Sequence, residues 1–93
     1  MSRRKELVKR VLHGRPHVHI GKGGLSESVL NEIDRQLEEN EVIKVRILRS
    51  AFSVEECDKD VFVKLLAERL NAKVLDVRGL TVILYRRRRL YKR

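Results

Sequence analysis

The chain has few of the features that mark secreted or membrane-embedded proteins. Its 93 residues include one cysteine, one proline and no tryptophan. A single cysteine cannot form a disulfide within the chain, and no apolar stretch approaches the ~18–20 residues that cross a bilayer. No pattern of a secretory signal peptide opens the sequence. We therefore expect a cytoplasmic protein.

The length and the hydrophobic content predict one small folded domain. Hydrophobic residues make up 42% of the chain, which is enough for a core and too much for a wholly disordered basic segment. A chain of this size buries only about 60–65% of its unfolded surface, so the core is expected to be modest. We expect a monomeric domain over residues 1–86, followed by a basic tail over residues 87–93.

Charge is segregated along the sequence. The formal net charge is +9, from 22 Lys and Arg against 13 Asp and Glu. Residues 1–24 carry seven Lys and Arg against one Glu, residues 25–43 carry six acids against one Arg, and residues 86–93 carry six cations and no acid. This distribution predicts one electropositive face and a polyanionic partner, most simply nucleic acid. A generally charged, soluble surface is the alternative.

Apolar spacing predicts an α/β (α+β) domain with three helices and a four-stranded mixed sheet, in the order α-β-α-β-α-β-β. Helices are expected over residues 3–13, 26–40 and 53–71, and strands over residues 17–20, 42–48, 73–78 and 80–85. The third helix has a capping-box pattern at Ser53 and a rival start at Asp58. Helical connections favour parallel pairing among some of the first three strands, and the tight turn at Gly79 favours an antiparallel final pair.

Three glycines and a lysine, Gly21-Lys22-Gly23-Gly24, separate a predicted strand from a predicted helix capped by Ser26. Glycines allow close backbone approach, and the first N–H groups of the helix point towards the loop. These features predict a clamp for backbone phosphates. KH domains use a GxxG loop in this way between two helices, so the comparison concerns mechanism and not fold. Walker and dinucleotide fingerprints are absent, and a glycine turn without a ligand remains the alternative.

Basic side chains outside the loop extend the predicted binding surface. Lys44 and Arg46 alternate with Val45 and Ile47, so they are expected to share one face of a strand. They could instead be solvent-facing charges that discourage edge pairing. The tail predicts attraction to phosphates without sequence readout, and a localisation signal or a solvated tail is the alternative. The predicted RNA contacts are Gly21, Lys22, Gly23, Gly24, Lys44, Arg46, Arg49, Arg78, Arg15, Arg3, Arg4, Arg86, Arg87, Arg88 and Arg89.

The sequence offers little for catalysis or metal binding. His13, His17 and His19 could bind zinc, but no cysteine pair or acidic ligand accompanies them. The single cysteine, Cys57, lies among acids that raise a thiol pKa, which favours a packing role over a nucleophilic one. Aromatic residues make up 4% of the chain, which disfavours a base-stacking sheet of the RRM type. We expect no catalytic residue, no metal and no cofactor.

Several segments together carry a family resemblance. Residues 13–20 lead through a proline to a short strand. Residues 20–29 read Ile-Gly-Lys-Gly-Gly-Leu-Ser-Glu-Ser-Val, residues 41–47 read Glu-Val-Ile-Lys-Val-Arg-Ile, and residues 82–86 read Val-Ile-Leu-Tyr-Arg. In this order and spacing the chain resembles the YhbY-like, or CRM (chloroplast RNA splicing and ribosome maturation), domain family. The resemblance implies a four-stranded mixed sheet with helices, similar to the C-terminal domain of a bacterial translation initiation factor. It also implies RNA binding through the GxxG loop and the neighbouring basic surface.

The sequence therefore predicts a non-catalytic protein that binds structured RNA. The resemblance implies ribosomal precursor RNA and pre-ribosomal particles as partners, with a role in large-subunit assembly or RNA folding. A second hypothesis is an architectural chromatin protein resembling Alba, which would dimerise and coat duplex DNA. A third is a small RNA-processing enzyme, which would need a carboxylate or histidine constellation that the sequence does not supply.

Overall fold

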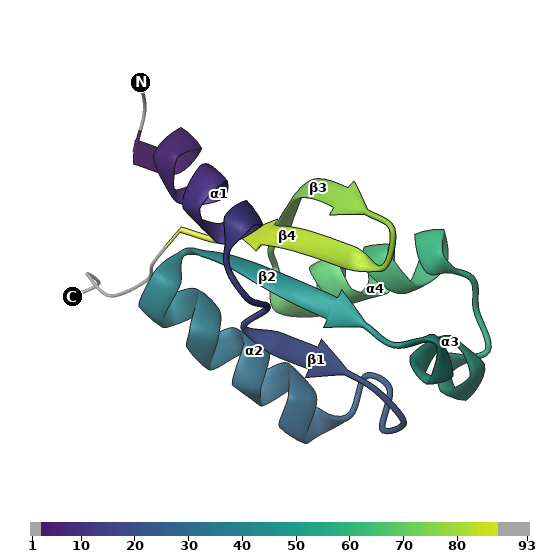
Figure 1. Ribbon diagram of the computed structural model, residues 1–93. Helices are drawn as coiled ribbons and strands as arrows, with labels where there is room; N and C mark the ends of the chain where they lie inside the picture. The colour runs from purple at the N-terminus through teal and green to yellow at the C-terminus, as the bar shows by residue number, and fades with distance from the viewer. Residues whose placement is uncertain (1–2, 88–93) are drawn as a thin grey trace.

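A four-stranded sheet carries four helices in the computed structural model, which describes residues 3–87 and the side chains from residue 5 onward (Figure 1). The elements are α1 (Arg3–His13), β1 (Val18–Ile20), α2 (Glu27–Asn40), β2 (Val42–Ile47), α3 (Arg49–Glu55), α4 (Lys59–Leu70), β3 (Lys73–Arg78) and β4 (Thr81–Tyr85). Within these residues no helix combines the length and apolar character of a membrane crossing. Of the predicted contacts, Arg88 and Arg89 lie outside the described residues, and the side chains of Arg3 and Arg4 lie outside the described side chains.

The strands lie in the order β1-β2-β4-β3. β1 pairs with β2 in parallel, and the other two pairings are antiparallel. The α+β class, the mixed four-stranded sheet, the parallel first pair and the antiparallel last pair are therefore confirmed. β2 is an internal strand, in agreement with its apolar sequence, because β1 and β4 pair with its two edges.

The two faces of the sheet are covered unequally. On one face, α2 and α4 pack their apolar stripes against alternate strand residues to form the core. Its fully buried side chains include Ile20, Ile33, Leu37, Ile43, Val45, Ile47, Phe62, Leu66, Val82 and Leu84. On the other face, α1 contacts β2 and β4 near the start of β2 (Figure 1). The remainder of that second face carries exposed side chains, so the fold leaves part of the sheet open.

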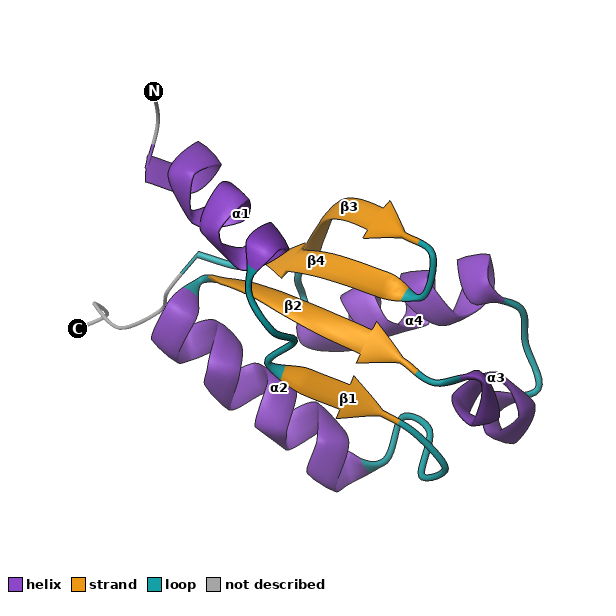
Figure 2. Cartoon of the chain, in the orientation of Figure 1, coloured by secondary structure: helices purple, strands orange, loops and turns teal. Residues whose placement is uncertain are grey.

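The region predicted as one third helix consists of two helices, and the expected order with three helices is wrong on this point (Figure 2). Asp58 begins α4 and its side chain accepts a hydrogen bond from the Val61 N–H at 3.1 Å. Ser53 lies inside α3 and does not begin a helix. Phe52 of α3 packs edge-to-face on Phe62 of α4, with ring centroids 5.2 Å apart. A left-handed residue, Glu56 with φ 54°, separates the two helices.

Cys57 lies between α3 and α4 and is partly buried against the core. Burial, followed by the neighbouring carboxylates of Asp58 and Glu55, raises the pKa of the Cys57 thiol. A raised pKa opposes thiolate formation, so the side chain acts as a small hydrophobic residue.

Arg86 joins the end of β4 to two helices. Its guanidinium forms ion pairs with Asp34 Oδ1 at 2.8 Å and Glu38 Oε2 at 3.0 Å, and donates to the Leu70 carbonyl at 2.8 Å. The residue is 8% exposed. The structure thus shows Arg86 in a packing role, which leaves little of its guanidinium exposed for the predicted RNA contact. The same pairs direct two carboxylates of α2, Asp34 and Glu38, towards the domain.

His17 links the start of β1 to β2. Its backbone N–H donates to the Lys44 carbonyl at 2.8 Å, and its ring Nδ1 accepts from the Lys44 N–H at 3.0 Å. Burial lowers the pKa of His17 below its ordinary value of 6.5. The folded state therefore favours the neutral ring, in which Nδ1 remains an acceptor.

The stability of the domain is expected to fall as pH is lowered from about 7 to about 5. Because the pKa of His17 is lowered in the folded state, the unfolded chain takes up a proton first as pH drops through 6.5. The variant His17→Asn keeps an acceptor oxygen near the Nδ1 position without titrating in this range. Urea unfolding should show a weaker pH dependence for His17→Asn than for the wild type. The control variant His19→Asn, at an exposed histidine, should show the same pH dependence of stability as the wild type. Equal pH dependence in all three proteins would contradict the role assigned to His17.

Candidate nucleic-acid interface

The glycine loop (residues 21–24) is a closed turn that follows β1 (Figure 2). The Gly24 N–H donates to the Gly21 carbonyl at 2.9 Å. Lys22 and Gly23 form the exposed tip. Within the described residues no backbone carbonyl accepts from the N–H of Lys22 or Gly23, so both groups can donate to a phosphate oxygen.

The base of the glycine loop is fixed to the body of the domain. Gly24 has a φ of 59°, and a Cβ added there would lie 2.5 Å from Oε2 of Glu55 and 3.0 Å from Cγ1 of Val54. Only glycine fits this position without strain. The next residue, Leu25, is buried in the core, and Ser26 caps α2 by accepting from the Val29 N–H at 3.3 Å. The exposed tip therefore projects from a rigid support.

Glu55, at the end of α3, holds the base of this loop from the opposite side. Its Oε2 accepts a hydrogen bond from the Leu25 N–H at 2.8 Å. The carboxylate thus satisfies a partly buried backbone donor beside the start of α2. The sequence did not reveal this residue, because nothing in the local pattern around Glu55 marks a partner 30 positions away.

Replacing Glu55 with alanine is expected to destabilise the domain by about 1–2 kcal/mol, because the Leu25 N–H loses its acceptor. The neighbouring variant Glu56→Ala removes an exposed acid of the same charge and should change stability by less than about 0.5 kcal/mol. Urea unfolding of both variants measures the difference. Equal stabilities would mean that the Glu55 hydrogen bond does not support the loop.

A polar row crosses all four strands on the open face of the sheet. His19 pairs with Arg46, Arg46 with Thr81, and Thr81 with Arg78, so the four side chains lie side by side. His19, Arg46 and Arg78 are exposed. Arg78 forms an ion pair with Asp76 at 2.8 Å, but its side chain remains 68% exposed. The row places two arginines where an extended polyanion can reach both.

The glycine loop and the polar row are continuous through Leu48. A Cβ added to Gly21 would contact Cδ1 of Leu48 at 3.3 Å, and Leu48 lies two residues beyond Arg46. Leu48 is 42% exposed and Val54, beside Gly24, is 50% exposed. Arg49 is exposed at the start of α3. The loop tip, two exposed aliphatic side chains and the cations thus form one surface.

The other predicted contacts lie in different places. Lys44 shares the strand face of Arg46, as predicted, but its Nζ donates to the carbonyls of Leu12 and Gly14 at 3.0 and 2.9 Å. These bonds hold the end of α1 on the sheet. Arg15 is exposed in the segment between α1 and β1, away from the glycine loop, and Arg87 is exposed just after β4. The register that placed His19 and Thr81 in the row was not readable from the sequence.

Comparison with known proteins agrees with this architecture. The family model of the CRS1/YhbY (CRM) domain matches residues 1–86. The chain belongs to the CRM domain family. This membership confirms the resemblance predicted from the loop and the two strand segments.

Two proteins of similar sequence are named as probable RNA-binding proteins. The chain is 37% identical over 91 residues to the "Probable RNA-binding protein MJ0652" of Methanocaldococcus jannaschii, and the match covers 92% of this chain and 66% of that protein. It is 27% identical over 85 residues to the "Probable RNA-binding protein YqeI" of Bacillus subtilis, covering 91% of this chain and 84% of that one. This chain thus spans just under two thirds of the archaeal relative.

A solved structure has the same fold. The solution structure of "the hypothetical protein SAV1595 from Staphylococcus aureus, a putative RNA binding protein" superposes with a TM-score of 0.71 at 31% identity. The match covers 95% of this chain and 88% of that chain. The α+β architecture with a four-stranded mixed sheet is therefore shared with a solved structure.

Proposed function

We propose that this CRM domain binds RNA, without catalysis, through the glycine loop and the adjoining open face of the sheet. The observation that carries the proposal is the rigidly supported loop tip. Its two backbone N–H groups and Lys22 are continuous with the polar row. The N–H groups and Lys22 would bind backbone phosphates, and Arg46, Arg49 and Arg78 would orient the RNA. The names of the relatives support an RNA partner.

The RNA we propose is structured, in particular ribosomal precursor RNA in pre-ribosomal particles. The domain would act as a cytoplasmic monomer in large-subunit assembly or RNA folding. The choice of an RNA partner rests on the CRM family membership and on the strongly basic composition. The basic tail would add attraction that depends on salt and not on sequence.

The test compares two nucleic acids at one fixed salt concentration, because affinity for either depends steeply on salt. The full chain is titrated by fluorescence anisotropy into a fragment of large-subunit precursor RNA and into duplex DNA of equal length. We expect tighter binding to the RNA and a single protein copy per site. Tighter, cooperative binding to duplex DNA, with dimers in solution, would favour the Alba-like architectural protein instead.

A further inference from the structure

A second concave site lies at the opposite end of β1 from the glycine loop. It is a cavity of about 270 Å³ between α1, the start of β1 and the end of α2. The cavity is smaller than the ~300–1,000 Å³ of sites for drug-sized ligands, so it suits a group the size of one nucleobase. Its lining residues are Leu7, Arg10, Val11, Gly14, Arg15, His17, Asn40 and Val42.

The lining offers apolar contact together with polar groups. Leu7 and Val11 are half-buried and Val42 is 1% exposed, so they form an aliphatic wall. His17 uses Nδ1 to accept from the Lys44 N–H, which leaves the ring proton on Nε2 as a donor. The amide nitrogen of Asn40 donates to the carbonyl and side-chain oxygens of Gln36, at 3.1 and 3.0 Å.

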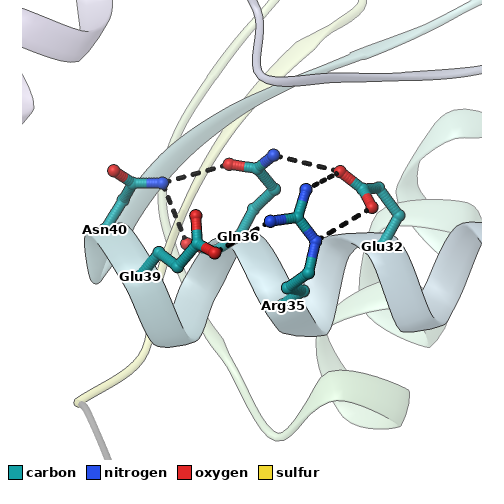
Figure 3. A network of polar contacts seen from close by, with 5 residues as sticks. All are labelled: Glu32, Arg35, Gln36, Glu39 and Asn40. Carbon is teal, nitrogen blue, oxygen red and sulfur yellow. Dashed lines mark hydrogen bonds and ion pairs between the residues drawn. The ribbon is translucent and has the colours of Figure 1, made fainter.

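The orientation of Asn40 fixes which of its atoms remains for a ligand. In Figure 3 its amide nitrogen is directed to Gln36 and its oxygen points away from it. No donor to this oxygen is found among residues 5–87, so it is left as an acceptor. A donor on His17 and an acceptor on Asn40 match the mixed donors and acceptors on the edge of an unpaired base.

The charge of the cavity favours a phosphate-bearing ligand. Arg10 and Arg15 line it and are exposed, and no carboxylate is among its described lining residues. Within the described part of the chain neither arginine has an ion-pair partner, so both can contact phosphates. Cations that track the backbone are one of the means by which proteins hold single-stranded nucleic acid, and here an aliphatic wall takes the place of the aromatic rings on which bases often stack.

Hydrogen bonds hold together the elements that surround the cavity. Lys44 binds the carbonyls of Leu12 and Gly14 and so fixes the end of α1. The backbone of His17, just before β1, pairs with that of Lys44 in β2. The distance from His17 to Gly21 along extended chain is about 13 Å, so one RNA segment can reach both sites.

We propose that this cavity holds one unpaired base of the RNA whose backbone binds the glycine loop. The proposal rests on the proposed RNA function and adds a ligand class to it: RNA with an unpaired nucleotide. Leu7, Val11 and Val42 contact the face of the base, His17 and Asn40 bond its edge, and Arg10 and Arg15 bind the flanking phosphates. Fully paired RNA cannot enter, because its bases are stacked inside the helix.

The test uses the isotope-labelled full chain in NMR titrations with a single-stranded oligoribonucleotide and with the same sequence annealed as a duplex. We expect the Asn40 side-chain amide and the His17 ring signals to shift with the single strand and to remain in place with the duplex. Arg10→Glu should weaken single-strand binding about tenfold. Lys9→Glu, the same charge change at an exposed neighbour outside the cavity, should weaken it by about threefold or less.

A second titration separates this proposal from the loop assignment. Nucleoside monophosphates are added to the wild type and to Gly23→Asp, in which the loop carries a repelling carboxylate. We expect the cavity signals to shift in both proteins. Single-strand binding that moves the loop signals but never those of Asn40 and His17 would overturn the cavity proposal and leave the loop intact. NMR signal shifts confined to the cavity residues would overturn the proposal that the glycine loop binds RNA.

Discussion

Gly23→Asp is expected to weaken RNA binding by about tenfold to a hundredfold while the domain stays folded. A like charge opposed to phosphate in a binding surface costs several kcal/mol, and about 1.4 kcal/mol is tenfold in affinity. Position 23 tolerates a side chain, because an added Cβ would meet only Ser26, at 3.7 Å or more. The new carboxylate would therefore lie beside the N–H groups and Lys22 without straining the backbone.

Two further variants make this result specific. Gly23→Asn has nearly the same shape without the charge, and we expect it to bind RNA within about threefold of the wild type. Gly24→Ala, in contrast, should lower stability, because position 24 has a positive φ and contacts Glu55 and Val54. Anisotropy gives the affinities and urea unfolding the stabilities. Equal affinities for Gly23→Asp and Gly23→Asn would remove the loop from the interface.

Arg86→Met is expected to lower the free energy of unfolding by about 2–3 kcal/mol. The substitution leaves two carboxylates and the Leu70 carbonyl without their shared cation. The loss should fall below the ~3–5 kcal/mol typical of a fully buried pair. The reason is that the side chains of Asp34 and Glu38 are 44% and 29% exposed and can turn to water.

The neighbouring variant Arg87→Met is the matched control. It removes the same charge from an exposed position and should leave stability within about 0.5 kcal/mol of the wild type. Below the unfolding transition, Arg86→Met should bind RNA no more weakly than Arg87→Met, because the Arg86 guanidinium faces the domain. A larger loss of affinity in Arg86→Met, with unchanged stability, would restore the original prediction that Arg86 contacts RNA.

Local patterns in the sequence were sufficient to predict features that depend only on neighbouring residues in the chain. Alternation of Lys44 and Arg46 with Val45 and Ile47 predicted which side chains face the core, because successive strand residues point to opposite faces. The N-cap at Ser26 was readable for the same reason. The region around Ser53 was misread because a capping-box pattern also occurs inside α3. The packing of Phe52 on Phe62 decides where the two helices lie.

Long-range contacts could not be read in this way. The sequence contained the loop, the basic strand and the closing strand, and their order and spacing determined the family and the fold class. Only the tertiary structure decided that Glu55 supports Leu25, 30 residues away, and that Arg86 pairs with Glu38, 48 residues away. It also decided the register that aligns His19, Arg46, Thr81 and Arg78. The physical reason is that periodicity reports the direction of each side chain within its own element. The partner that a side chain meets depends on how separate elements pack.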